Sequence, residues 1–116
     1  MNKFCSIIIR TKNEERWISS CLREVFNQNH KDFEVIIVDN YSKDKTIEKA
    51  QEWPIKKIIK IKKYLPGLAL NMGIKESKGN YLVFLSAHCI PKNIFWLSCL
   101  VNSLNEDKKY AAVYGR

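Results

Sequence analysis

The chain has 116 residues, of which 46% are hydrophobic and 28% are charged, a composition typical of a single soluble globular domain. Its apolar runs are far shorter than the roughly 20 residues of a membrane-spanning helix, and its N-terminus lacks the apolar stretch of a secretory signal, so we expect a cytoplasmic protein. Lys and Arg number 20 against 12 Asp and Glu, and the net charge of +8 favours anionic partners: nucleotide phosphates, nucleic acid or the anionic lipid at the inner face of the membrane.

The first predicted unit is a strand at about 4–10 followed by a helix. The strand is nearly continuous in Ile, as expected for a strand that is covered on both faces. Asn13 is expected to cap the helix, with Glu14 and Glu15 in the first turn, where the helix dipole favours acidic residues. One apolar stripe along this helix indicates its buried face and consists of Trp17, Ile18, Cys21, Leu22, Val25 and Phe26.

The second and third predicted strands, at about 33–39 and 57–61, enclose a short helix. Ser42 is expected to cap this helix, and Trp53-Pro54 to end it. Lysines surround the third strand and the turn before the short helix: Lys45, Lys56, Lys57, Lys60, Lys62 and Lys63. These lysines have two interpretations. They either prevent the edge strand from pairing with the sheet edge of another molecule, or they form an anion-binding patch.

The rest of the chain predicts two more helices and two more strands, at about 80–85 and 111–114. One helix is expected to run from Pro66 to a C-cap at Lys78-Gly79, and Gly73 within it indicates either backbone approach to a diphosphate or close helix–sheet packing. The next helix follows Asn93, and its apolar face comprises Ile94, Leu97, Leu100, Val101 and Leu104. Alternating strands and helices predict an α/β fold: a doubly wound, mostly parallel sheet with helices on both faces.

Three predicted strands deliver polar residues to the same edge of this sheet. Thr11 and Asn13 follow the first strand, Asp39 ends the second, and Ser86 and His88 follow the fourth. Ligands of an open parallel sheet bind outside the carboxyl ends of its strands, so we expect these residues to converge on one cleft. Asp39 there has two interpretations of equal weight: an acceptor for a ribose hydroxyl or base, or a residue that serves only the backbone of its own turn.

Several functional classes are disfavoured by missing motifs. The chain has no GxxxxGK[ST], and no GxGxxG follows its first strand, which argues against a P-loop ATPase and a dinucleotide-binding dehydrogenase. The aromatic residues fall mostly on faces predicted to be buried, so we expect no nucleic-acid binding. The cysteines lack zinc-site spacing and indicate apolar thiols in a reduced protein: Cys5, Cys21, Cys89 and Cys99.

Four segments resemble motifs of the family-2 glycosyltransferases, which have the GT-A fold. They occur in the order of that family and at about its spacing: TKNE at 11–14, VDNYSKDKT at 38–46, ALNMG at 69–73 and LSAH at 85–88. The last stands where the family has Leu-Asp-x-Asp. Over residues 1–116 the chain thus resembles the N-terminal, nucleotide-sugar-binding part of such an enzyme.

The resemblance implies a set of residues that bind a nucleoside diphosphate sugar: Thr11, Asn13, Glu14, Asp39, Asn71, Ser86 and His88. Thr11 and Asp39 would contact the nucleoside, and the turn 86–88 would hold the diphosphate, directly or through Mn²⁺ or Mg²⁺. Ser86 and His88 replace the two aspartates of the family, which removes two negative charges and leaves His88 as the implied metal ligand. The alternative is that His88 hydrogen-bonds a phosphate or the loop backbone without metal.

The implied reaction is transfer of a sugar from the nucleoside diphosphate sugar to an acceptor hydroxyl. In the family the general base lies well downstream of the fourth strand, so we expect a truncated chain that is inactive alone. The alternative is a non-catalytic nucleotide-binding module, or a subunit completed by another chain. We also expect self-association through apolar residues left partly uncovered: Trp96, Val113 and Tyr114.

Overall fold

The computed structural model describes residues 4–62, 66–79 and 81–106, and these form a four-stranded parallel sheet with helices around it. The strands lie in the order β3-β2-β1-β4, with Thr11 paired to Asp39 and Arg10 to Ser86. The strands are β1 (Cys5–Thr11), β2 (Phe33–Asp39), β3 (Lys57–Lys60) and β4 (Tyr81–Ser86). The predicted fold class and its first four strands are confirmed, whereas the predicted strand at 111–114 lies outside the described residues.

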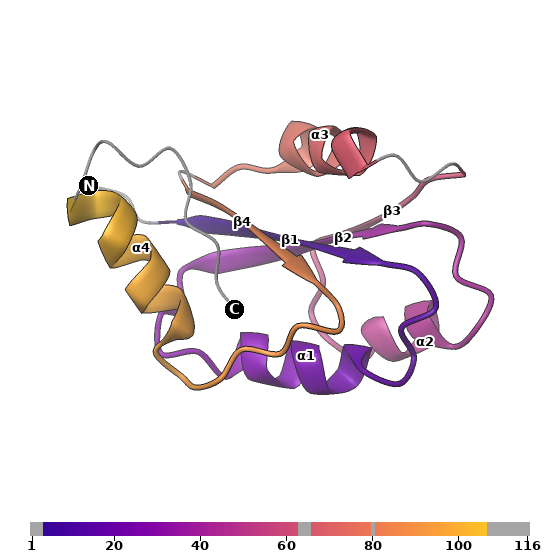
Figure 1. Ribbon diagram of the computed structural model, residues 1–116, viewed down its shortest axis with the longest axis horizontal. Coiled ribbons are helices and arrows are strands. Elements are labelled where there is room, and N and C mark those ends of the chain that lie inside the picture. The colour runs from indigo at the N-terminus through magenta and orange to yellow at the C-terminus, as the bar shows by residue number, and fades with distance from the viewer. Residues whose placement is uncertain (1–3, 63–65, 80, 107–116) are drawn as a thin grey trace.

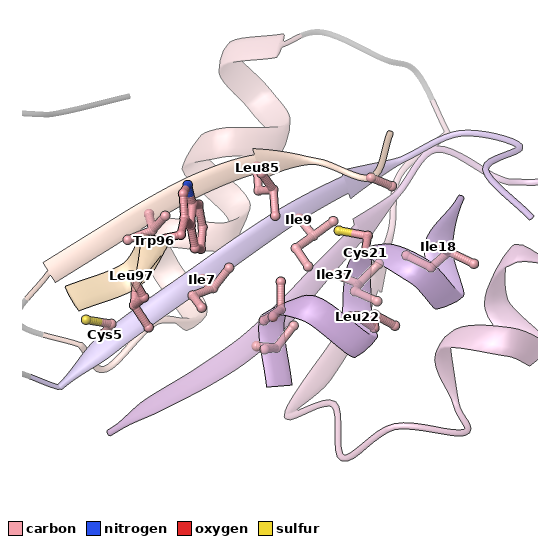
Figure 2. Close-up of a cluster of buried hydrophobic side chains, with 14 of the residues drawn as sticks. Cys5, Ile7, Ile9, Ile18, Cys21, Leu22, Ile37, Leu85, Trp96 and Leu97 are labelled. Atoms are coloured by element: carbon pink, nitrogen blue, oxygen red, sulfur yellow. The ribbon is translucent and has the colours of Figure 1, made fainter. Parts of the chain in front are cut away.

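Both faces of the sheet are buried, which explains the nearly continuous apolar sequences of its strands. Three helices, α1 (Ile18–Phe26), α2 (Thr46–Ala50) and α4 (Trp96–Glu106), cover one face, and α3 (Pro66–Glu76) covers the other (Figure 1). Ile7 and Ile9 belong to the core between the sheet and the helices α1, α2 and α4, where Figure 2 shows them. Ile8 belongs to the core between the sheet and α3. None of the helices in the described ranges is long and apolar enough to cross a membrane.

Both predicted helix caps are wrong. The helix α1 begins at Ile18 without a side-chain cap, and Asn13 lies well before it in the left-handed region, with φ 52°. The helix α2 begins at Thr46, and its start does not involve Ser42. The side chains of Asn13 and Ser42 are instead engaged by backbone groups in the two loops after β1 and β2.

Three large apolar residues lie elsewhere than expected. Trp17 precedes α1 and is 40% exposed, with the Arg16 guanidinium 4.9 Å from its ring centre. Ile94 precedes α4 and is also 40% exposed. Trp96, expected to be partly uncovered, lies at the start of α4 and is buried in the core between the helices and the sheet (Figure 2). The remaining described positions of the two predicted apolar stripes lie in or against this core, as expected: Ile18, Cys21, Leu22, Val25, Phe26, Leu97, Leu100 and Val101.

Two glycines allow close approach of backbone segments. A Cβ on Gly73 would lie 2.6 Å from Cγ2 of Ile8, so its interpretation as a helix–sheet packing residue is confirmed. A Cβ on Gly79 would lie 2.5 Å from the backbone N of Ser6. The predicted C-cap at Gly79 is wrong, because α3 ends at Glu76 and Gly79 does not have a positive φ. Its N–H donates to the Ser6 hydroxyl at 2.8 Å instead.

Candidate functional site

A cleft of about 190 Å³ opens at the carboxyl ends of β1 and β4. The chain proceeds from β1 to β2 on one side, while β4 joins β1 on the other, so this is the topological switch point of the sheet. The six lining residues come from the ends of the two strands and the loops that follow them: Arg10, Thr11, Lys12, Glu14, Ser86 and His88. Residues up to 78 positions apart in sequence therefore meet in one place.

Behind the cleft, Asp39 is buried and fully engaged by its surroundings. Only 1% of it is exposed, and its Oδ1 accepts hydrogen bonds from the hydroxyls of Thr11, at 2.5 Å, and Ser42, at 2.6 Å. Its Oδ2 accepts from the backbone N–H of Ser42 at 2.8 Å. In this structure Asp39 thus fixes the turn after β2 and the side chain of Thr11, and it does not line the cleft.

Two loops hold each other beside the cleft, the one after β1 and the one after β2. Asn13 donates its backbone N–H to the Ser42 hydroxyl and accepts from the backbone N–H of Lys43, both at 2.8 Å. The backbone N–H of Glu14 donates to the hydroxyl of Thr46 at 2.7 Å, and Thr46 is fully buried. These bonds fix the backbone that carries Glu14 into the cleft.

Asp44 joins the same two loops through several donors. Its carboxylate accepts from the backbone N–H of Thr46 at 3.0 Å, from the Thr46 hydroxyl, and from the backbone N–H of Glu15 at 3.2 Å. Partial desolvation acts to raise the pKa of Asp44, but these hydrogen bonds outweigh it and hold the pKa below its ordinary value. Asp44 and Thr46 therefore join the start of α2 to the loop after β1.

The turn after β4 brings His88 to the opposite side of the cleft. The backbone N–H of Ala87 donates to the carbonyl of Arg10 at 3.2 Å, which fixes the turn against β1. The imidazole of His88 is exposed, with Nδ1 lying 3.1 Å from Oγ of Ser86 and 3.4 Å from Oε1 of Glu14. Glu14 and His88 thus face each other from the two loops that flank the switch point.

The structure brings four of the seven predicted site residues to the cleft wall: Thr11, Glu14, Ser86 and His88. Asp39 and Asn13 lie next to it through the contacts described above. Asn71 is exposed on α3, which covers the opposite face of the sheet from α1, and it does not line this cleft. Arg10 and Lys12 line the cleft but were not predicted from the sequence, although a cation at the end of a buried strand was a usable signal.

A divalent cation would find few protein ligands here. In the ranges 4–62, 66–79 and 81–106, no group of three or more His, Cys, Asp or Glu side chains could hold a metal ion. The cleft offers the carboxylate of Glu14, the imidazole of His88 and the hydroxyl of Ser86. Mg²⁺ is commonly held by one or two carboxylates together with substrate phosphates. With a single carboxylate, this donor set would need phosphate oxygens to complete the coordination of a cation.

Solved structures of two glycosyltransferases resemble this chain. Residues 1–349 of TarS from Staphylococcus aureus, solved in complex with UDP-GlcNAc, match with a TM-score of 0.78 and 23% identity, over 89% of this chain and 31% of the other. The mannosyltransferase PcManGT from Pyrobaculum calidifontis, solved with GDP-Man and Mn²⁺, matches with a TM-score of 0.79 and 22% identity, over 86% and 32%. At these identities the likeness shows the GT-A fold.

Sequence comparison identifies the family itself. A relative from Methanococcus voltae, dolichyl N-acetyl-alpha-D-glucosaminyl phosphate 3-beta-D-2,3-diacetamido-2,3-dideoxy-beta-D-glucuronosyltransferase, is 37% identical over 100 residues. The alignment covers 79% of this chain and 31% of that relative, so the chain spans about a third of its length. The model of glycosyl transferase family 2 matches residues 6–116, nearly the whole sequence. The chain therefore belongs to glycosyl transferase family 2.

Proposed function

We propose that residues 1–116 form the donor-binding part of a glycosyltransferase that moves a sugar from a nucleoside diphosphate sugar to an acceptor hydroxyl. The observation that carries the proposal is the cleft at the switch point between β1 and β4. Its wall combines two cations, Arg10 and Lys12, with the hydroxyl of Ser86, a set that suits a phosphorylated ligand. UDP-GlcNAc and GDP-Man, which the structural relatives bind, belong to this class of ligand.

In this proposal the two sides of the cleft bind different parts of the donor. The nucleoside lies against Thr11, Asn13 and the turn that Asp39 holds, with Asp39 acting mainly by fixing Thr11. The diphosphate lies between Lys12 and the turn of Ser86 and His88. Asn71 reaches the donor only if the ligand extends beyond the cleft toward α3.

Chemically, the departing diphosphate must be stabilised as the bond to the sugar breaks. Arg10 and Lys12 place positive charge beside it without any proton transfer. A divalent cation, Mn²⁺ or Mg²⁺, would add Lewis-acid stabilisation of the phosphate oxygens, and we propose His88 as one of its ligands. The hydroxyl of Ser86 and, when it is protonated, the imidazole of His88 can donate hydrogen bonds to the same oxygens.

A second candidate function is a non-catalytic nucleotide-binding module, or a subunit completed by another chain. The observation that favours it is the turn after β4, where a hydroxyl and an imidazole occupy the positions of the two family aspartates. Such a module would bind the nucleotide in the same cleft and would differ only in the absence of transfer.

Two further partners belong to this proposal. We propose a cytoplasmic protein with peripheral contact to anionic membrane, supported by exposed lysines on and beside the edge strand β3: Lys56, Lys57, Lys60 and Lys62. Lys57 also pairs with Glu76 at 3.1 Å, so this edge serves the fold as well. Self-association is supported by the exposed side chains of Ile94 and Phe95.

Isothermal titration calorimetry with UDP and with GDP tests the donor site. We expect binding that Lys12→Ala weakens by about tenfold, because one charge-assisted hydrogen bond to phosphate is lost. Lys56→Ala, which removes another exposed lysine at the far edge of the sheet, is the matched control and should leave the affinity unchanged. An equal loss of affinity in the two variants would mean that binding depends only on net charge, and it would contradict a nucleotide site in the cleft.

A further inference from the structure

Tyr41 has a backbone conformation that its residue type disfavours. Two non-glycine residues in the described ranges have a positive φ, Asn13 with 52° and Tyr41 with 44°. Asparagine tolerates this left-handed region, whereas a bulky aromatic residue there is a steric outlier. Such strain persists where the surrounding structure imposes it, and it is concentrated at ligand-binding sites. A glycine would adopt the same φ without strain, so the tyrosine side chain requires a separate explanation.

The backbone on either side of Tyr41 is held by the loop after β1. The N–H of Asn40 donates to the carbonyl of Thr11 at 2.9 Å. On the other side, the hydroxyl of Ser42 accepts from the N–H of Asn13 at 2.8 Å. Neither bond uses the side chain of Tyr41. The two loops therefore impose the positive φ, and any residue at position 41 would have to adopt it.

The side chain of Tyr41 contributes little to the packing of the fold. It is 49% exposed and belongs to neither of the two hydrophobic core clusters. Within the described ranges its hydroxyl makes no hydrogen bond, and its ring contacts no other aromatic ring and no cation. A glycine would thus serve the fold at least as well, and a ligand explains the tyrosine better than stability does.

The loop that carries Tyr41 lies beside the proposed nucleotide cleft. The backbone bonds on either side of Tyr41 join it to Thr11 and Asn13. These two residues flank Lys12, and both Thr11 and Lys12 line the cleft. β1 and β2 are neighbouring strands, which lie about 4.8 Å apart, a distance that a tyrosine side chain spans. The ring is therefore within reach of a ligand that extends from the cleft over the loop after β2.

A nucleobase at this position has few other side chains to bind it. Asp39, at the end of β2, is 1% exposed and already accepts hydrogen bonds on both of its oxygens. Arg10 and Lys12 supply the positive charge that suits the phosphates. A half-exposed aromatic ring provides the missing contact, because every nucleobase has a π face and stacking needs no hydrogen bond to its edge.

We infer that Tyr41 stacks on the nucleobase of the bound nucleoside diphosphate. The inference rests on the proposed nucleotide site and names the residue that holds the base there. Because hydrogen bonds already fix the backbone on both sides of Tyr41, little backbone freedom is lost when the ligand binds. The contact is made with the face of the base, so it contributes to the binding of uridine and guanosine nucleotides alike.

Calorimetric titration with UDP, GDP and inorganic pyrophosphate tests this contact. We expect Tyr41→Ala to weaken the binding of UDP and GDP by about tenfold, because one aromatic–base stack is lost. Pyrophosphate has no base, and its affinity should equal that of the wild type. Tyr41→Phe keeps the ring and should bind all three ligands as the wild type does.

Phe95→Ala is the matched control for the loss of an exposed aromatic ring. Phe95 is 52% exposed, and the carbonyl of the preceding Ile94 accepts from the N–H of Asn29, near the amino end of β2. The cleft lies at the carboxyl ends of the strands. This variant should therefore leave all three affinities unchanged.

Tyr41→Gly separates a ligand contact from a structural role. Glycine relieves the strain of the positive φ, so this variant should melt at the same temperature as the wild type or higher. It should nevertheless lose as much UDP affinity as Tyr41→Ala. A lower melting temperature for Tyr41→Gly, with UDP affinity unchanged, would show that the tyrosine serves the fold instead of the ligand.

The other outcomes separate this inference from the proposed function. Unchanged UDP affinity in Tyr41→Ala, while Lys12→Ala still weakens binding, would overturn the stacking contact and leave the proposed function intact. An equal loss for UDP and pyrophosphate would place the effect at the phosphates, and an equal loss in Tyr41→Phe would assign it to the hydroxyl; either result overturns stacking. If the folded wild type binds neither UDP nor GDP, the proposed function fails and this inference fails with it.

Discussion

The hydroxyl of Thr11 shares a buried carboxylate with the turn after β2, and its removal should destabilise the fold. Thr11 is 4% exposed and Asp39 1% exposed, so no water replaces the lost hydrogen bond. We expect Thr11→Val to lower the free energy of unfolding by about 1–3 kcal/mol in urea denaturation. Thr11→Ser keeps the hydroxyl and should recover much of the loss. A Val variant as stable as the wild type would show that the bond contributes nothing.

Asp44 gives the stability a dependence on acid pH. Its pKa is lowered in the folded state, so the associated stabilisation is complete above the ordinary Asp value of about 3.9 and is lost as the pH falls below it. In thermal melts, Asp44→Asn should be less stable than the wild type at about pH 6, and the difference should shrink at about pH 3. A difference that stays constant across this range would contradict the assignment.

At the scale of elements, the connection from α3 to β4 depends on the absence of a side chain at Gly79. A Cβ there would meet backbone atoms of β1, which cannot move aside as a flexible side chain would. We expect Gly79→Ala to destabilise the protein by about 1–3 kcal/mol in chemical denaturation. Lys78→Ala, at the exposed neighbouring position, should change stability little. Equal stability of the two variants would mean that the loop relaxes without cost.

The described elements could be predicted from the sequence because buried parallel strands and amphipathic helices have strong local patterns. The motifs also indicated which strand ends carry polar residues. The roles within the loops could not be predicted, because Asn13 and Ser42 bond to groups on each other's loop, whereas local rules consider only the next helix. Gln28 was missed for the same reason: its buried amide joins the end of α1 to the backbone of Asn93 and Leu97.

Across the whole molecule, two of the cysteines are buried in the core and two are exposed. Burial is the main cause that raises the pKa of Cys5 to about 11 and that of Cys21 to about 12, while Cys89 and Cys99 are exposed. With an aromatic disulfide reagent at about pH 8, we expect Cys89 and Cys99 to react quickly and the buried pair only after denaturation. Rapid reaction of all four in the folded protein would indicate that the core under α1 opens readily.

Nuclear magnetic resonance can show, residue by residue, whether a nucleoside diphosphate binds at the switch point of the sheet. Backbone amide signals would be followed while UDP, and separately GDP, is added to the labelled chain in a buffer containing MgCl2. We expect the largest shifts on residues 10–14 and 86–88, with little change along β3. Shifts concentrated on the lysines of β3, or none in the two loops of the cleft, would contradict this prediction.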